Sequence, residues 1–337
     1  MNGSVRRDVR IGVVGFGSIG RNHARNLRDL AGIELVGVTD LAPEALAQAT
    51  ELGFPTYPSI DALIAARLDG VVISVPTSLH EDVAMPFIAA RVALLVEKPL
   101  AGTLATAKRL LQACTAAAVP LMVGYIERYN PAIVAVRDFA ASGAIGEVIS
   151  ISTRRVGAVP PRIRDSSVLV DIGVHDIDMV AYITGARLTL RAAQGGMAVL
   201  HDRLDYASLM IDAEGCSAMV ETNWVTPTKI RELSITGTNG FAHVDYITQV
   251  ARYARGSSFE PQENFAAFVA NYEEGSLAAI PVTRREPLAR ELEVFASGIR
   301  GGELPDPGMA LASLRIAEEA TQMIERQNVR RPIFVSA

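Results

Sequence analysis

Short apolar runs alternate with longer amphipathic stretches over the first part of the chain. The apolar runs are continuous, which is typical of parallel strands that are buried on both faces. The predicted strands cover residues 9–14, 33–40, 70–75, 93–96 and 121–124. The stretches between the later strands predict helices near residues 42–52, 59–67, 79–91 and 103–118. This order indicates βαβ units arranged around one parallel sheet.

Beyond residue 124 the pattern changes, and strands appear in which apolar and polar residues alternate, as in residues 217–225. Such alternation predicts a mostly antiparallel sheet with one face on helices and the other face available. The candidate strands 188–193 and 207–211 carry little charge. We therefore expect the available face to meet another subunit of a homodimer or homotetramer, unless helices of the same chain cover both faces.

The change of pattern divides the chain into a first domain of residues 1–124 and a second of residues 125–337. The first is expected to be a parallel α/β domain and the second an α+β domain with an open, mostly antiparallel sheet. Two final helical stretches, 287–300 and 309–327, are assigned to the second domain. The last of them can pack back on the first domain.

A glycine-rich turn follows the first strand and opens a helical stretch through Leu30. Its residues are Gly15, Phe16, Gly17, Ser18, Ile19 and Gly20. The first glycine permits a tight turn, the second lets a pyrophosphate approach the backbone, and the third allows close packing of helix on strand. The helix N-terminus offers N–H groups and partial positive charge to phosphates. The sequence therefore predicts a doubly wound Rossmann domain that binds a dinucleotide.

Asp40, at the end of the second predicted strand, indicates which dinucleotide binds. A carboxylate there can accept hydrogen bonds from the ribose hydroxyls and repels a 2′-phosphate. Leu41 follows instead of an arginine that would pair with that phosphate. NAD is therefore favoured over NADP. The alternative is that Asp40 only caps the helix that begins near Pro43.

Composition narrows the class of protein. The chain has 337 residues, 49% of them hydrophobic, and a formal net charge of −5, which gives no general attraction to nucleic acid. Cys114 and Cys216 lie far apart and lack metal-ligand spacing. No run reaches membrane-spanning length, and the first residues lack the features of a signal peptide. We expect a soluble cytoplasmic protein with no membrane or nucleic-acid partner.

Lys98 is one of only three lysines and follows the fourth predicted strand, at the edge where open α/β sheets bind ligands. It can hydrogen-bond a substrate hydroxyl, whereas an ordinary solvated lysine is the alternative. Its neighbour Glu97 and the turn with Pro76, Thr77 and His80 lie at the same edge and are candidate cofactor contacts. His80 can equally be a helix-capping or surface residue, and His23 is expected to pack against the sheet.

Asp171, His175 and Asp178 recur at the spacing of one helical face, which places two carboxylates around an imidazole. A carboxylate can orient the imidazole and stabilise its protonated form, so this face suits proton transfer. Two alternatives remain. The three residues can ligate a metal, although no further ligand set at a fitting spacing is present, or Asp171 can be a helix N-cap.

These features together resemble the Gfo/Idh/MocA family of NAD(P)-dependent sugar and cyclitol oxidoreductases. The matching segments are the glycine-rich turn through Leu27, Glu97–Pro99, Gly124–Pro131, Asp171 with His175, and Glu286–Leu292 followed by Phe295. The resemblance implies a Rossmann domain, a sheet domain used in oligomer contacts, and a catalytic trio of Lys98, Asp171 and His175. His175 would take the hydroxyl proton while Lys98 polarises the oxygen and Asp171 balances charge, although Lys98 is also a candidate for the proton.

A narrower resemblance, to the UDP-N-acetylglucosamine 3-dehydrogenases of this family, rests on residues 154–165 and 221–231. Four arginines in the first segment are able to pair with a diphosphate: Arg154, Arg155, Arg162 and Arg164. They can also be a solvated surface loop. Together with Tyr129, Lys98, Asp171 and His175, three of them (Arg154, Arg155 and Arg164) form the expected substrate contacts. Oxidation of myo-inositol or another sugar is the alternative, and a non-catalytic sensor of NAD is an alternative of another class.

Overall fold

The computed structural model describes residues 7–159, 166–256 and 277–327. The chain divides into two compact units, which are described separately. Unit 1 comprises Met1–Tyr129 and Arg285–Glu318, and unit 2 comprises Asn130–Arg284 and Glu319–Ala337.

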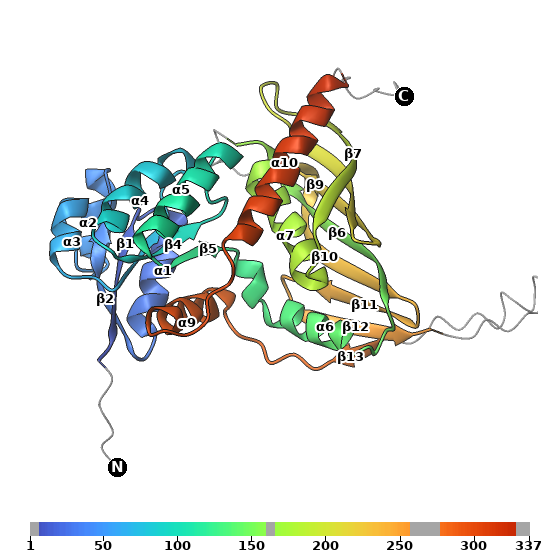
Figure 1. Ribbon diagram of the computed structural model, residues 1–337, viewed down its shortest axis with the longest axis horizontal. Coiled ribbons are helices and arrows are strands. Elements are labelled where there is room, and N and C mark those ends of the chain that lie inside the picture. The colour runs from blue at the N-terminus through green and yellow to red at the C-terminus, as the bar shows by residue number, and fades with distance from the viewer. Residues whose placement is uncertain (1–6, 160–165, 257–276, 328–337) are drawn as a thin grey trace, which may run out of the picture. The chain divides into compact units, whose positions relative to one another are not determined.

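Unit 1 is built on a five-stranded parallel sheet in the order β2-β1-β3-β4-β5 (Figure 1). The strands are β1 (Val9–Val14), β2 (Ile33–Thr39), β3 (Gly70–Ile73), β4 (Ala93–Glu97) and β5 (Leu121–Gly124). All five were predicted from their continuous apolar runs, and nearly all of their residues are buried. The order and direction of the strands confirm the predicted Rossmann sheet.

Helices lie against both faces of this sheet. They are α1 (Ser18–Asp29), α2 (Pro43–Glu51), α3 (Ile60–Ala65), α4 (His80–Ala89), α5 (Leu104–Ala117) and α9 (Pro287–Ile299). Gly12 and Gly70 point to opposite faces, because Gly70 pairs with Ile11, the residue before Gly12. Side chains of α3 lie against Gly12, and side chains of α9 lie against Gly70. The sheet is therefore doubly wound.

The place of α9 differs from the sequence prediction. Residues 287–300 were assigned to the second domain, and the boundary was expected at residue 124. In the structure the boundary follows Tyr129 and α9 belongs to unit 1. The reason is a shared core: Leu288, Leu292 and Phe295 are buried with residues of β1 and α1.

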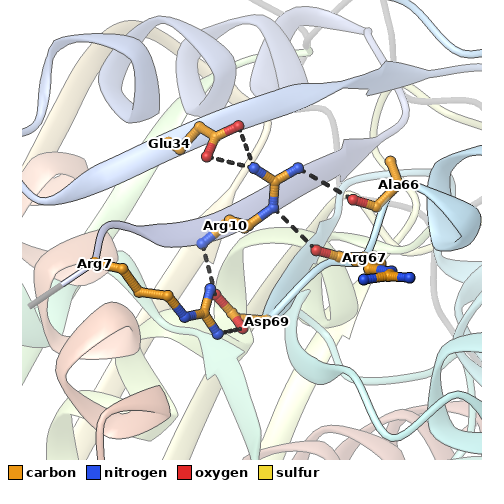
Figure 2. Close-up of polar contacts among 6 residues, drawn as sticks. All are labelled: Arg7, Arg10, Glu34, Ala66, Arg67 and Asp69. Atoms are coloured by element: carbon orange, nitrogen blue, oxygen red, sulfur yellow. Dashed lines mark hydrogen bonds and ion pairs between the residues drawn. The ribbon is translucent and has the colours of Figure 1, made fainter.

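The amino end of the unit 1 sheet is tied together by a polar cluster, shown in Figure 2. The Arg10 guanidinium on β1 donates to Glu34 on β2, at 2.6 Å, and to the carbonyl oxygens of Ala66 and Arg67. The Asp69 carboxylate accepts hydrogen bonds from the Arg10 backbone N–H and from the Arg7 guanidinium. The cluster lies at the edge opposite the carboxyl ends of the strands, so it supports the fold and leaves the ligand edge open.

Unit 2 is built on an eight-stranded sheet in the order β13-β12-β11-β10-β6-β9-β8-β7. Its strands are β6 (Val148–Ala158), β7 (Leu188–Gly196), β8 (Tyr206–Ala213), β9 (Cys216–Asn223), β10 (Val225–Gly237), β11 (Gly240–Asp245), β12 (Val250–Arg255) and β13 (Ala278–Ile280). All neighbouring pairs are antiparallel except β6 with β9. The predicted mostly antiparallel sheet is confirmed. The predicted strand 217–225 is two strands, because the chain leaves β9 at the buried Trp224 and re-enters as β10.

Helices α6 (Pro131–Ala141) and α7 (Val174–Thr184) pack on one face of this sheet (Figure 1). Asn130 caps α6 through its side-chain oxygen, which accepts the Ala132 N–H. Along β8 and β9 the residues facing the helices are buried, whereas Met210 and Met219 on the other face are 50% and 58% exposed. We call that other face, with Ser152, Ser208, Met210, Met219 and Ser234, the open face.

The last helix, α10 (Gly308–Arg326), is shared between the units. Its residues up to Glu318 belong to unit 1, where the Glu318 carboxylate accepts the Leu104 N–H at the start of α5. Beyond Glu318 the helix belongs to unit 2, where Gln327 donates to the Ala193 carbonyl of β7. Within the described residues, no helix combines the length and the apolar character that crossing a bilayer requires.

Candidate functional site

The three glycines between β1 and α1 each meet a different physical demand. Gly15 has φ +92°, a conformation that side chains other than glycine rarely adopt. A Cβ built on Gly20 would lie 1.9 Å from the Gly15 carbonyl oxygen, so the helix can approach the turn only without a side chain there. At Gly17, by contrast, no described atom lies within 4 Å of such a Cβ. Gly17 thus leaves open backbone where a phosphate can approach.

The first turn of α1 is arranged for an anion. Gly17 is the N-cap, and among the described residues no side chain caps this end and no acidic residue lies in the first turn. Ser18 and Ile19 are exposed beside it. The unsatisfied N–H groups and the helix dipole both favour a negatively charged group at this position.

Asp40 is held against the glycine-rich turn. One carboxylate oxygen accepts the Phe16 N–H at 2.6 Å, and the other accepts the Ala42 N–H at 2.8 Å, just ahead of α2. The N-cap of α2 is Ala42, and no side-chain cap is formed there within the described residues, so the capping alternative is wrong. The first bond links Asp40 directly to the turn. Each carboxylate oxygen has a second lone pair, so Asp40 can still accept from a hydroxyl. Leu41 beside it is 82% exposed.

The chain after β3 and the chain after β4 are joined through His80. Its ring nitrogens face the carbonyl oxygens of Val75 on one side and of Pro99 and Leu100 on the other, at 3.0–3.2 Å. Burial lowers the pKa of His80, although the carbonyl contacts act in the opposite direction. His80 is 1% exposed, so the alternative that it is a surface residue is wrong. Pro76 and Thr77 form the turn that His80 supports.

The carboxyl end of β4 carries Glu97 and Lys98. Glu97 accepts a hydrogen bond from His23 of α1, at 2.7 Å, and another from the Lys98 N–H, at 3.3 Å. Burial alone would raise the pKa of Glu97, but the His23 bond and the positive charges of His23 and Lys98 hold this pKa below its usual range. Lys98 is half-buried and its peptide bond to Pro99 is cis. The predicted packing of His23 against the sheet is confirmed, since it is fully buried.

Tyr129, the last residue of unit 1 before Asn130, packs against the core of that unit. Its hydroxyl contacts the Met122 sulfur at 4.0 Å. The neighbouring Arg128 is 7% exposed and its guanidinium lies 5.4 Å from the centre of the Tyr125 ring. The substrate contact expected of Tyr129 stays a prediction.

In unit 2, Asp171 and His175 lie at the junction of two kinds of helix. Residues Leu169–Gly173 form a π-helical turn, and α7 begins only at Val174. The regular helix expected at Asp171 is instead a π turn, whereas His175 and Asp178 both lie in the regular helix α7. That the three residues share one face stays a prediction. Asp171 is not an N-cap either, since it lies inside the turn. Asp171 is half-buried, His175 is 9% exposed and Asp178 is fully buried.

The arginines of β6 do not gather as one diphosphate site. Arg155 faces α7, where its Nε lies 3.0 Å from the Asp176 carboxylate, and the pair is almost completely buried. Arg154, the next residue along the strand, lies on the open face and pairs with Glu221 at 3.0 Å. Side chains of adjacent strand residues point to opposite faces, so these two arginines cannot bind one diphosphate. Arg162 and Arg164 lie outside the described residues.

Several further residues that shape these sites were not predicted from the sequence. Ser74 donates to the Gly15 carbonyl at 2.9 Å and so fixes the glycine-rich turn. Asp176 pairs with Arg155, and Glu291 of α9 is buried near Glu97. One signal was available for Glu291: it occupies an apolar helical face between Leu288, Leu292 and Phe295.

Comparisons with known proteins agree with this architecture. Residues 9–125 match the family described as "Oxidoreductase family, NAD-binding Rossmann fold" and residues 133–243 match the "GFO/IDH/MocA C-terminal domain". UDP-N-acetylglucosamine 3-dehydrogenase of Acidithiobacillus ferrooxidans is 30% identical over 295 residues, covering 86% of this chain and 88% of the relative. Inositol 2-dehydrogenase of Rhizobium meliloti is 28% identical over 333 residues, covering 94% and 97%.

The solved structures agree as well. That of UDP-N-acetylglucosamine 3-dehydrogenase GnnA from Acidithiobacillus ferrooxidans superposes with a TM-score of 0.81 at 26% identity, covering 95% of this chain and 98% of the other. The resemblance inferred from the motifs is thereby confirmed. The chain belongs to the Gfo/Idh/MocA family of oxidoreductases.

Proposed function

We propose that the protein is an NAD-dependent dehydrogenase that oxidises a secondary alcohol of a sugar or cyclitol, or catalyses the reverse reduction. The observation that carries the proposal is the open backbone of Gly17 at the uncapped start of α1, with Asp40 bonded to the same turn. This arrangement suits a dinucleotide: the helix N-terminus receives its phosphates and the carboxylate receives ribose hydroxyls.

Asp40 and Leu41 support NAD over NADP. A 2′-phosphate placed on the adenosine ribose would meet the Asp40 carboxylate, and Leu41 offers it no charge. In initial-rate assays we expect kcat/KM to be at least tenfold higher with NAD. Equal values with the two cofactors would contradict the preference.

The proposed chemistry uses Lys98, Asp171 and His175. When bound, the nicotinamide accepts the hydride that leaves the substrate carbon. His175 takes the hydroxyl proton, Lys98 donates a hydrogen bond to the substrate oxygen, and Asp171 stabilises the resulting imidazolium. The setting of Lys98, at the ligand edge of the sheet beside Glu97, supports its part.

Single-turnover hydride transfer, followed by the absorbance of the reduced cofactor, tests these roles. We expect Lys98→Ala and His175→Ala each to slow the step by about a hundredfold or more. The exposed Lys108→Ala and His201→Ala are matched controls and should leave it unchanged. Near-normal rates in both site variants would overturn the assignment.

For the substrate we propose UDP-N-acetylglucosamine, oxidised at C3, on the strength of the relative that is 30% identical. The two arginines of β6 do not support binding of a diphosphate group, since Arg154 and Arg155 form ion pairs within unit 2. That observation favours myo-inositol as a second candidate, together with the inositol 2-dehydrogenase that covers 94% of the chain. Incubation with NAD and each compound in turn distinguishes the two candidates, because only the true substrate yields reduced cofactor. Tight NAD binding without turnover of any sugar would instead indicate a non-catalytic sensor.

The open face of unit 2 supports a homo-oligomer. Its central row places Met210 opposite Met219, and Met219 beside Ser152, so no charged side chain lies in this part of the row. We propose that this face meets another subunit.

A further inference from the structure

Glu291 is a buried acid in an apolar setting. It lies on the face of α9 that also carries Leu288, Leu292 and Phe295, and its side chain is fully buried. Among the residues that the structure describes, neither of its carboxylate oxygens has a hydrogen-bond partner. An ionised carboxylate in that position would lose its hydration without replacement, which is costly.

A second carboxylate lies close to it. One ligand atom from each of His23, Glu97 and Glu291 lies within 4.8 Å of the other two. Glu97 already receives hydrogen bonds from His23 and from the Lys98 N–H, whereas Glu291 receives none within the described residues. A buried carboxylate and a partly buried one this close repel each other when both are ionised.

We propose that Glu97 and Glu291 hold a single proton between them, so that the pair carries one negative charge beside Lys98. With the proton on Glu291, Glu97 remains the anion that faces His23 and Lys98. Loss of this proton would add a second negative charge to the pair and strengthen the attraction for the ammonium form of Lys98. Glu291 is thus a positioning residue that acts on Lys98 through Glu97, an inference that rests on the proposed role of Lys98.

The surrounding charges agree with this distribution. Burial, and next the charge of Glu97, raise the pKa of Glu291 well above its usual range, while Arg128 acts in the opposite direction. His23 and Lys98 hold the pKa of Glu97 low despite its burial. The charged groups that face the pair are therefore His23 from α1, Lys98 from the end of β4 and Arg128 from the turn before α6. The two acids thus have different environments, which favour the protonated form of Glu291 and the ionised form of Glu97.

A divalent cation held by His23, Glu97 and Glu291 is the competing arrangement. The positive charges of Arg128 and Lys98 already act on the two carboxylates, and the short His23–Glu97 hydrogen bond occupies ligand atoms that a cation would need. Both facts favour the proton. Stoichiometric metal in the purified protein, measured by mass spectrometry, would overturn the proposal.

Infrared spectroscopy of the whole protein tests the proton directly, without substrate. At neutral pH we expect the carbonyl band of a protonated carboxylic acid in the wild type, and its loss in Glu291→Gln. Glu293→Gln, a substitution in the same helix at a carboxylate paired with Arg290, is the control and should keep the band. Identical spectra for the wild type and Glu291→Gln would overturn the inference. If Glu291→Gln does not fold, Glu291→Leu supplies the same comparison.

The stability of the protein supplies a second readout. An acid whose pKa is raised on folding keeps its proton in the folded state and loses it on unfolding, so the folded state loses stability as pH rises from the unfolded pKa through the folded one. Glu291→Gln should therefore become progressively more stable relative to the wild type as pH rises. A difference that does not change with pH would contradict the shared proton.

The pH dependence of kcat supplies a third readout. The relevant part is the alkaline limb, the high-pH range in which kcat falls. We expect this limb to move by about one pH unit or more in Glu291→Gln and to stay in place in Glu293→Gln. A merely structural role would change the melting temperature but not the pH at which the limb falls. Absence of turnover would count against the proposed function alone, whereas turnover with an unmoved limb would count against the inference alone.

Discussion

Gly17 and Gly20 are both glycines of one turn, yet the structure assigns them opposite consequences on substitution. A methyl group on Gly20 would meet the Gly15 carbonyl at 1.9 Å, whereas on Gly17 it meets open space. Gly20→Ala should lower the free energy of unfolding by about 3 kcal/mol or more. Gly17→Ala should change it by less than about 1 kcal/mol and weaken NAD binding at least tenfold, because the methyl occupies the approach to the backbone. Urea unfolding and calorimetric titration measure the two effects, and equal loss of stability in both variants would contradict this view.

Asp40 and its neighbour Leu41 allow a test of cofactor choice. Replacing Asp40 with Ser and Leu41 with Arg removes the carboxylate and supplies a cation for a 2′-phosphate. The double variant should shift the NADP to NAD ratio of kcat/KM by about a hundredfold towards NADP. Leu41→Arg alone is the control, since it retains the Asp40 carboxylate. An unchanged ratio in the double variant would show that Asp40 serves only its bonds to Phe16 and Ala42.

At the residue level, the sequence predicted those site residues whose role depends on local chain geometry. The glycine-rich turn is one: its conformation follows from the residues themselves. Arg155 could not be assigned in the same way, because its partner Asp176 comes from another element. Period-two alternation was a usable signal that Arg154 and Arg155 point apart, but it required knowing that residues 148–158 form a strand.

At the level of elements, the buried pair Arg155–Asp176 fastens α7 to β6. Its guanidinium also lies 5.0 Å from the centre of the Tyr246 ring. Arg155→Met alone should lower the free energy of unfolding by about 3–5 kcal/mol, because it leaves the Asp176 carboxylate buried without its ion-pair partner. Adding Asp176→Leu should recover at least half of the loss. A double variant as unstable as the sum of the single variants would contradict a coupled pair.

The amino edge of the unit 1 sheet should respond to acid through Asp69. Partial burial acts to raise the pKa of Asp69, but hydrogen bonds from Arg7 and the Arg10 N–H outweigh it and hold this pKa below its usual range. A lowered pKa contributes stability above the unfolded value of about 3.9, and the contribution is lost as pH falls through the folded value.

Asp69→Asn should therefore lower the free energy of unfolding by about 1 kcal/mol at neutral pH and by less in strong acid. Chemical unfolding at several pH values measures this difference. The exposed Asp8→Asn is the control. A difference that persists unchanged into strong acid would contradict the assignment.

Most elements could be predicted, because continuous apolar runs and alternation are local signals. The π turn at Leu169–Gly173 could not, because the spacing of apolar residues does not distinguish a π turn from an α-helix. The break between β9 and β10 could not be predicted either, because it depends on a distant segment: the ladder stops at Trp224, whose backbone N–H donates to the Asp205 carbonyl.

At the level of the whole molecule, the sequence predicted two domains but placed the helix at residues 287–300 in the wrong one. α9 follows unit 2 in the chain and is part of unit 1, where Glu286 at its start accepts hydrogen bonds from Arg25 and Asn26 of α1. Only long-range contacts reveal this. The apolar face of α9 showed that the helix packs somewhere, without identifying the partner.

The open face of unit 2 predicts the state of assembly. Met210 and Met219 are half-exposed or more and lie opposite each other on β8 and β9, where their burial in a second copy would remove apolar surface from water. Met219→Lys should therefore dissociate the oligomer, because a charge would be buried at the centre of the contact. Sedimentation velocity should show a smaller species, with an unchanged circular dichroism spectrum. Ile247→Lys, on an exposed residue between β11 and β12, is the control and should leave assembly intact. A wild-type protein that sediments as a monomer would contradict the proposed subunit contact.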